Sequence, residues 1–134
     1  MKLIDTNIFI YAAGRVHTNK DSSIKTIEEA LTEQGKYNVS VEILQELLHV
    51  YANQKKADKG IKLVESILRV FPQPFPLTLR DIQKSCVLLK KYPNLKVRDS
   101  IHAAVVLNRG LEGIVSYDKD FDMLSEVKRF VPSL

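Results

Sequence analysis

Apolar residues along the chain fall into two kinds of pattern, short continuous runs and helical repeats. The short runs predict strands at residues 2–5, 37–39, 113–116 and 129–131, and a proline-containing edge strand at 75–77. Apolar residues spaced three or four apart predict helices starting near Ile8 and over residues 21–34, 40–51, 56–70, 78–91 and 99–110. Short strands alternating with amphipathic helices are typical of a parallel sheet covered on both faces. The pattern therefore predicts an α/β fold of three layers (α/β/α) with a central parallel sheet of four or five strands.

The helices at 43–51 and 61–70 are unusually rich in apolar residues, and the helical spacing places Ile61 and Leu68 on an inward face. Two interpretations stay open, because a small domain with one sheet does not necessarily bury all of them. They either complete the core of one copy or form an interface between two copies. The residues concerned are Leu47, Leu48, Val50, Ile61, Val64 and Leu68.

Length and composition are those of an ordinary globular protein with one domain, here residues 1–134, of which 45% are hydrophobic and 27% charged. Cys86 is the only cysteine, so the chain forms no internal disulfide. It lies in the apolar run at 86–89 and is predicted to be buried. With one cysteine and three histidines, a zinc site of soft ligands is disfavoured, and a bound metal is expected to be held by oxygen.

The N-terminus places Asp5 where a signal peptide requires an apolar stretch, and no run approaches the ~18 apolar residues of a membrane span. We therefore expect a cytoplasmic protein that does not enter the membrane. The net charge of +4 and the sequence pI of about 9.2 weakly favour a polyanionic partner.

Acidic residues occur at the ends of the predicted strands and at the starts of the helices beside them. In an open α/β sheet, ligands bind at the carboxyl ends of the strands, so these carboxylates are expected to converge. Their mutual repulsion then requires cations, and Mg²⁺ or Mn²⁺ suits oxygen ligands. Taken one at a time, each acid also fits a turn, a helix first turn or a solvated surface. The residues are Asp5, Glu42, Glu46, Asp99, Asp118 and Asp120.

The joint arrangement of four segments carries more information than any single acid. They are Leu-Ile-Asp-Thr-Asn at 3–7, Val-Glu-Ile-Leu-Gln-Glu-Leu-Leu at 41–48, Arg-Asp-Ser-Ile-His-Ala-Ala at 98–104 and Ile-Val-Ser-Tyr-Asp-Lys-Asp-Phe at 114–121. In this order they resemble the four acidic motifs of the PIN-domain ribonucleases, over essentially the whole chain. A chain this compact is most similar to the VapC toxins of bacterial and archaeal toxin–antitoxin modules.

The resemblance implies a set of roles for residues at matching positions. Asp5, Glu46, Asp99 and Asp118 correspond to the catalytic acids. Of these, Asp5, Asp99 and Asp118 are the expected metal ligands, with Asp120 as a further one. Glu46 is preferred over Glu42 because it precedes an apolar Leu-Leu pair, as the family's acid does. Thr6, Asn7 and Ser116 match polar positions that orient the acids or hold water.

The activity implied is hydrolysis of RNA phosphodiester bonds by a Mg²⁺- or Mn²⁺-dependent endoribonuclease, in which a metal ion lowers the pKa of water and stabilises the leaving oxygen. Arg15, Lys20 and Arg98 are candidate RNA-binding residues, with a solvated charged surface as the alternative. His102, three residues after Asp99, either reaches the site or is structural. Tyr11 and Tyr117 offer rings for stacking on an unpaired base, or pack in the core.

The resemblance also implies two protein partners, a second copy of the chain and an antitoxin that blocks the acidic site. Two alternatives remain at this point: a catalytically silent PIN scaffold that acts as an interaction module, and an RNA-processing nuclease outside any toxin pair. Other magnesium-dependent α/β classes fit less well. A receiver domain requires an acidic pair after the first strand, and a haloacid dehalogenase-type phosphatase requires a second aspartate where Asn7 stands.

Overall fold

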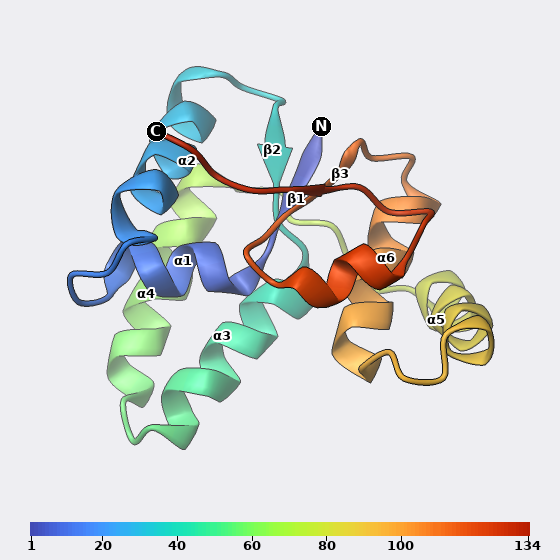
Figure 1. Ribbon diagram of the computed structural model, residues 1–134. Coiled ribbons are helices and arrows are strands. Elements are labelled where there is room, and N and C mark those ends of the chain that lie inside the picture. The colour runs from blue at the N-terminus through green and yellow to red at the C-terminus, as the bar shows by residue number, and fades with distance from the viewer.

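Four short parallel strands form the sheet in this computed structural model, which describes residues 1–134 (Figure 1). The strands are β1 (Lys2–Ile4), β2 (Tyr37–Asn38), β3 (Gly113–Val115) and β4 (Arg129–Phe130), in the spatial order β2-β1-β3-β4. Leu3 of β1 pairs with Ile114 of β3. Strands from opposite ends of the chain are thus the two central ones.

Helices cover both faces of this sheet, which confirms the predicted three-layer α/β/α architecture (Figure 1). One face carries α1 (Thr6–Ala13), α2 (Lys20–Thr32), α3 (Val41–Asn53) and α4 (Ala57–Val70), and the other carries α5 (Leu79–Lys91) and α6 (Val97–Asn108). A 3₁₀ helix, η1 (Lys119–Met123), connects β3 to β4.

The core has two halves because neighbouring strand residues point to opposite faces of the sheet. Ile4 and Val115 pack with the helices α1 to α4, in a cluster that includes Phe9. Leu3 and Ile114 pack against the other face, with residues of α5, α6 and the segment after η1. The strands are apolar on both faces for this reason, as expected of a buried parallel sheet.

The predicted edge strand at 75–77 is reduced to a single bridge between Phe75 and Ser40 beside β2. The Phe75 N–H donates to the Val39 carbonyl at 2.9 Å, and its carbonyl accepts from the Val41 N–H at 2.9 Å. Pro74 and Pro76 flank Phe75 and have no N–H to donate. The pairing therefore stops after one residue, and the sheet has four strands.

Other element boundaries shift by one or two residues. Helix α2 covers residues 20–32 instead of 21–34, and α6 starts at Val97. Asp99 therefore lies inside the first turn of α6 and does not precede it. Asp5, which ends the first strand, is itself the N-terminal cap of α1: its Oδ1 accepts a hydrogen bond from the Thr6 N–H at 2.8 Å.

Three predictions about burial were wrong. Cys86 is exposed, because α5 turns Ser85 and Leu88 inward and leaves Cys86 on its outer side. Ile61 and Leu68 of α4 are 45% and 38% exposed, since Gly60 and Ile67 occupy the buried side of that helix.

No helix is both long and apolar enough to cross a membrane.

A buried ion pair fixes α5 to the end of α6, and we call it the Asp81 clip, formed by Thr78, Asp81, Asn108 and Arg109. The Asp81 carboxylate is fully buried and accepts hydrogen bonds from Arg109 at 2.8 and 3.1 Å, from Asn108 at 2.9 Å and from the Thr78 N–H at 2.9 Å. Burial alone would raise the pKa of Asp81, but these donors, Arg109 foremost, lower it to about 2. The donors of the clip thus fully compensate the charge of the Asp81 carboxylate.

Candidate active site

The site is built around Asp5, at the carboxyl end of the central strand β1. Besides the capping bond from Thr6, its Oδ2 accepts a hydrogen bond from the Ser116 hydroxyl at 2.6 Å and one from Asn7 Nδ2 at 3.3 Å. Burial raises the pKa of Asp5, and the charge of His102 and the hydrogen bonds from Ser116 and Thr6 offset part of the effect. A buried carboxylate held by three donors has a fixed orientation.

The loop after β3 is folded around Ser116. The Ser116 hydroxyl accepts hydrogen bonds from Asn7 Nδ2 at 3.1 Å and from the Asp118 N–H at 3.0 Å. The Asp118 carboxylate in turn accepts from the Asp120 N–H at 2.9 Å, which caps η1. Asn7 and Ser116 therefore lie between Asp5 and the segment that carries Asp118, and their predicted role in orienting the acids stays a prediction.

Asp99 reaches the same edge of the sheet from the first turn of α6. It is buried, and its Oδ2 has no hydrogen-bond partner. Burial and then the charges of Asp118 and Asp5 raise the pKa of Asp99 to about 6. Hydrogen bonds from the protein therefore stabilise the ionised form of Asp99 less than that of Asp5.

The fourth acid comes from α3, where Glu46 and not Glu42 points to the site. Glu46 Oε2 accepts a hydrogen bond from His102 Nε2 at 2.9 Å. Burial opposes ionisation of Glu46, but this hydrogen bond and the imidazolium charge lower its pKa overall. The same contact, with the charge of Asp5, raises the pKa of His102 against the effect of its burial. Glu42 is half-buried in the first turn of α3, outside the pocket.

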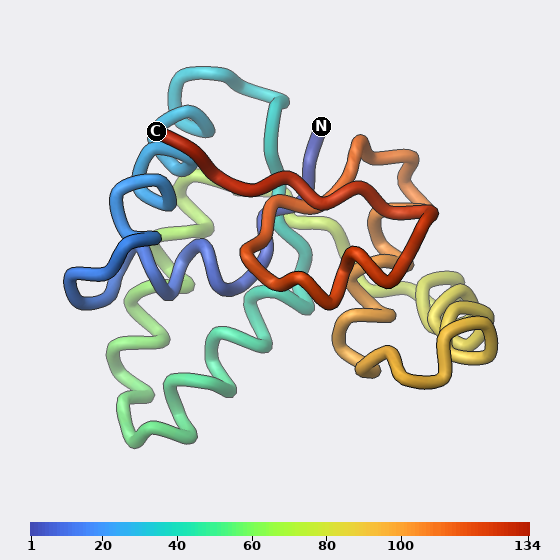
Figure 2. Tube along the Cα trace, in the orientation of Figure 1, coloured from blue at the N-terminus to red at the C-terminus, as the bar shows by residue number.

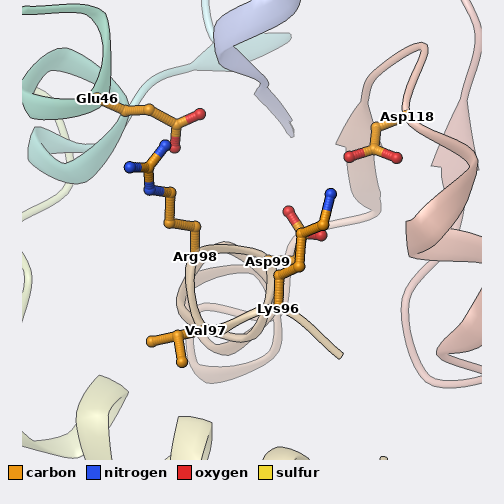
Figure 3. Close-up of a pocket in the computed structure, with 6 residues that line it drawn as sticks. All are labelled: Glu46, Lys96, Val97, Arg98, Asp99 and Asp118. Carbon is orange, nitrogen blue, oxygen red and sulfur yellow. The ribbon is translucent and has the colours of Figure 1, made fainter. Parts of the chain in front are cut away.

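Three of the acids, Glu46, Asp99 and Asp118, border a pocket of about 400 Å³ that is open to solvent. Figure 3 shows its lining residues, with Arg98 extending toward Glu46 on one side and Asp99 and Asp118 on the other. Lys96, the N-cap of α6, also lines the pocket, and its ammonium lies 3.4 Å from Asp120. Lys96 was not among the predicted site residues, whereas the sequence left open whether His102 reaches the site, and its contact with Glu46 shows that it does. Lys96 could have been noticed as a basic residue at the N-cap of the helix that carries Asp99.

The structure leaves two of the predicted RNA-binding residues outside this pocket. Arg15 is exposed in the connection between α1 and α2, and Lys20 begins α2 with its ammonium donating to the Gly14 carbonyl. Of the three predicted residues, Arg98 alone lines the pocket. Their roles stay predictions.

Tyr11 and Tyr117, the two tyrosines near the acids, are fixed by packing and by hydrogen bonds. The Tyr117 hydroxyl forms hydrogen bonds with Ser22 at 2.6 Å and Ser23 at 2.9 Å. Tyr11 packs edge-on against Tyr117, with 5.3 Å between ring centroids. Tyr117 thereby fastens the loop of Asp118 to α2, which favours core packing over base stacking for this residue.

Oxygen and nitrogen donors at the site fall into two groups suited to a cation. Asp5, Glu46 and His102 form one group and Asp99, Asp118 and Asp120 the other, with the donor atoms of each group within 4.8 Å of one another. The buried side-chain atoms that lack a hydrogen-bond partner are Thr6 Oγ1, Asp99 Oδ2 and His102 Nδ1. All three belong to this region. Clustered carboxylates with free oxygen atoms fit a hard divalent cation such as Mg²⁺ or Mn²⁺.

The fold and this arrangement of acids define the PIN-domain class, and the chain belongs to the PIN domain family, which matches residues 2–127. The resemblance found in the sequence is thereby confirmed. Ribonuclease VapC13 of Mycobacterium tuberculosis is 29% identical over 129 residues, covering 96% of this chain and 98% of that protein. Ribonuclease VapC23 of the same species is 30% identical over 121 residues, covering 88% and 93%.

Solved structures show the same fold at lower identity. VapBC2 from Rickettsia felis, bound to a DNA fragment from its promoter, matches with a TM-score of 0.76 at 15% identity, over 98% of both chains. FitAcB from Neisseria gonorrhoeae matches with a TM-score of 0.76 at 19% identity, over 97% of this chain and 96% of that one. Both similarities concern the whole chain.

Proposed function

We propose that this protein is the ribonuclease toxin of a VapBC-type toxin–antitoxin module, a hydrolase that cleaves RNA with Mg²⁺ or Mn²⁺ bound in the acidic pocket. The observation that carries the proposal is Asp99, a buried carboxylate with an unpaired oxygen among Asp5, Asp118 and Asp120. Full-length similarity to proteins named VapC ribonucleases supports the substrate class.

Asp5, Asp99 and Asp118 would hold the cation, with Asp120 as a further ligand and Glu46 as a ligand through water. When bound, the cation supplies Lewis acidity and lowers the pKa of water. Ser116 and Asn7 keep the Asp5 carboxylate oriented through the hydrogen bonds described above. Arg98 and Lys96 lie on the pocket wall, where their charges can bind a phosphodiester and neutralise the charge on its oxygens.

An antitoxin is the second proposed partner. An apolar groove of about 270 Å³ between α1, α2 and α4 offers a binding surface. Phe9, Ala12, Ile27 and Leu63 are among its lining residues. An apolar segment of an antitoxin would cover this groove, and an arginine from it would pair with the acids and displace the cation. Structural neighbours that are VapBC complexes support this proposal.

A homodimer is the third element of the proposal. Leu48, Ile61 and Leu68 remain partly exposed on α3 and α4, whereas Leu47 is fully buried. The apolar set identified in the sequence is thus divided between the core and the surface. The exposed part is available for a twofold interface between two copies. Light scattering of the purified chain tests this, because a monomer at tens of micromolar would rule out a stable dimer.

Cleavage of RNA by the purified protein tests the central proposal. We expect Mn²⁺ or Mg²⁺ to support cleavage and a chelator to abolish it. Glu46→Gln should reduce the cleavage rate far more than the matched control Glu42→Gln, since only Glu46 of these two residues lines the pocket. A folded protein that binds Mn²⁺ but cleaves no RNA would favour the silent-scaffold alternative. Growth arrest on expression, relieved by an antitoxin encoded beside it, would separate a toxin from an RNA-processing enzyme.

A further inference from the structure

His102 is a polar residue in an apolar stretch of α6. It lies one turn after Asp99 and is 1% exposed, and the four residues that follow it, Ala103 to Val106, are buried and apolar. Burying an imidazole costs free energy unless its nitrogens are hydrogen-bonded. If this position served only the stability of the fold, an apolar side chain would be favoured there. The presence of an imidazole therefore indicates a further role.

The single hydrogen bond of the ring supplies that reason. His102 Nε2 donates to Glu46 Oε2 at 2.9 Å, while Nδ1 has no partner. An ionised carboxylate only accepts hydrogen bonds, so the proton of this contact belongs to Nε2. One ring nitrogen is left unsatisfied, and the other is directed at an acid of the pocket.

Glu46 is held by fewer hydrogen-bond donors than Asp5, and His102 is the foremost of them. Asp5 is held by the Thr6 N–H, Ser116 and Asn7, and the backbone of Asp118 is held by Ser116. Glu46 has a longer side chain, is 16% exposed, and extends from α3 to meet the helix that carries Asp99. Its hydrogen bond from His102 is the link between α3 and α6 at the pocket.

We propose that His102 is a positioning residue, whose Nε2–H holds the Glu46 carboxylate in place at the acidic pocket. The inference rests on the proposed function, because it assigns Glu46 a part in that site. Ligation of a cation by His102 fits less well, since Nε2 is already directed at Glu46 and the ring is buried behind it. The role is specific to the donor atom and not to the imidazole.

Two substitutions at this position separate the donor from the ring. His102→Gln places an amide N–H near the position of Nε2, whereas His102→Leu keeps bulk and removes the donor. We expect His102→Leu to lower the cleavage rate and the Mn²⁺ affinity about 10–100-fold, as for other partners of ligating groups. His102→Gln should retain both to within a few-fold. Ser100→Ala is the matched control: Ser100 is buried on the same helix and bonds Ser85 and Val97, away from the acids.

The double variant His102→Leu/Glu46→Gln completes the test. If His102 acts through Glu46, the double variant cleaves no more slowly than Glu46→Gln alone. Full additivity of the two losses would overturn the proposal. Equal losses of cleavage rate in His102→Gln and His102→Leu would also overturn it. If the wild type then shows nitrogen coupling in the electron paramagnetic resonance of bound Mn²⁺, His102 is a ligand. If both variants instead lose melting temperature equally, His102 is a packing residue.

The design also distinguishes failure of this proposal from failure of the proposed function. A wild-type protein that cleaves no RNA counts against the ribonuclease, while Mn²⁺ affinity still reports on His102. Affinity that falls in His102→Leu and recovers in His102→Gln supports positioning, and affinity unchanged in both contradicts it. If His102→Leu does not fold, His102→Met, which also lacks the donor, provides the same comparison with His102→Gln.

Discussion

The protein contains two buried acidic centres that differ in how their charge is compensated. At the Asp81 clip, one carboxylate receives a guanidinium, an amide and a backbone N–H, and its pKa falls to about 2. At the acidic pocket, several carboxylates share few donors, and the pKa of Asp99 rises to about 6. Both centres lie beside α6, one at each of its ends, with Asp99 in its first turn and Arg109 directly after its last residue. Figure 2 shows the backbone of α6 (orange) next to that of α5 (yellow).

The difference indicates which centre serves stability and which serves chemistry. A paired, hydrogen-bonded acid contributes to the fold, and breaking the pair leaves a buried charge without a partner. An acid with an unpaired oxygen and like charges nearby destabilises the fold until a cation is bound. Perturbed pKa values of the second kind gather at functional sites. Burial alone does not distinguish the two.

The largest effect is expected from Asp5→Asn at the acidic pocket. It removes the charge of the central carboxylate and retains its shape. We expect the cleavage rate to fall by more than ~100-fold, beyond the range of residues that only support a ligand. The melting temperature of the metal-free protein should stay the same or rise, since one of the repelling charges is gone. A marked loss of stability would place Asp5 with Asp81 as a structural acid.

Asp81→Asn should show the opposite pattern. It leaves Arg109 without its carboxylate partner, so we expect a loss of about 3 kcal/mol in the free energy of unfolding. Cleavage per folded molecule should be unchanged, because no atom of the clip lines the pocket. Urea unfolding and a cleavage assay well below the melting temperature measure the two effects. Replacing Arg109 as well, with Met, should recover part of the stability.

Mn²⁺ should stabilise the protein through the acidic pocket and not through the clip. At ~100 times its dissociation constant, a cation bound only to the folded state adds about 2.7 kcal/mol. We expect this gain in the wild type and in Asp81→Asn, and a smaller one in Asp99→Asn. Thermal melts with and without Mn²⁺ provide the measurement. An undiminished gain in Asp99→Asn would place the cation elsewhere.

The pH dependence of stability without metal should separate the two centres by sign. Asp81 has a lowered pKa, so its contribution of about 2 kcal/mol is present above pH 4 and is lost as the pH falls toward 2. Asp99 has a raised pKa, so stability should fall by up to about 3 kcal/mol as the pH rises from 4 through 6.

Each variant should remove one limb of this profile. Asp99→Asn should flatten the curve between pH 4 and 6, and Asp81→Asn should flatten it between pH 2 and 4. Chemical denaturation in the presence of a chelator gives the values. A profile of Asp99→Asn that still declines from pH 4 to 6 would assign that decline to another group.

The sheet and the gathering of acids could be predicted because local patterns determine them. Apolar runs fixed the strands, and the rule that ligands meet the carboxyl ends of parallel strands placed Asp5 and Asp118 at one edge. The exposed Cys86 could not be predicted in this way. Residues 86–89 are apolar throughout, and the rotation of α5 on α6 decides which of them face inward.

Contacts between distant helices were the other limit. Asp81 forms a capping box with Thr78 at the start of α5, a local pattern, but its pairing with Arg109 depends on how α5 crosses the end of α6. The preference for Glu46 over Glu42 came from the family resemblance, and the structure adds the physical reason, which is the reach from α3 to His102. Short-range pattern identifies the acids, whereas packing selects the partners that hold them.

The position of β3 has a consequence for how the protein is made. This central strand comes from residues 113–115, yet it separates β1 from β4. A growing chain that has not reached it has only β1 and β2 to pair, fewer than the three strands a stable sheet usually needs. Ser116 and Asp118 are also absent at that stage. The acidic pocket therefore forms late in synthesis, after long-range pairing of the kind that slows folding.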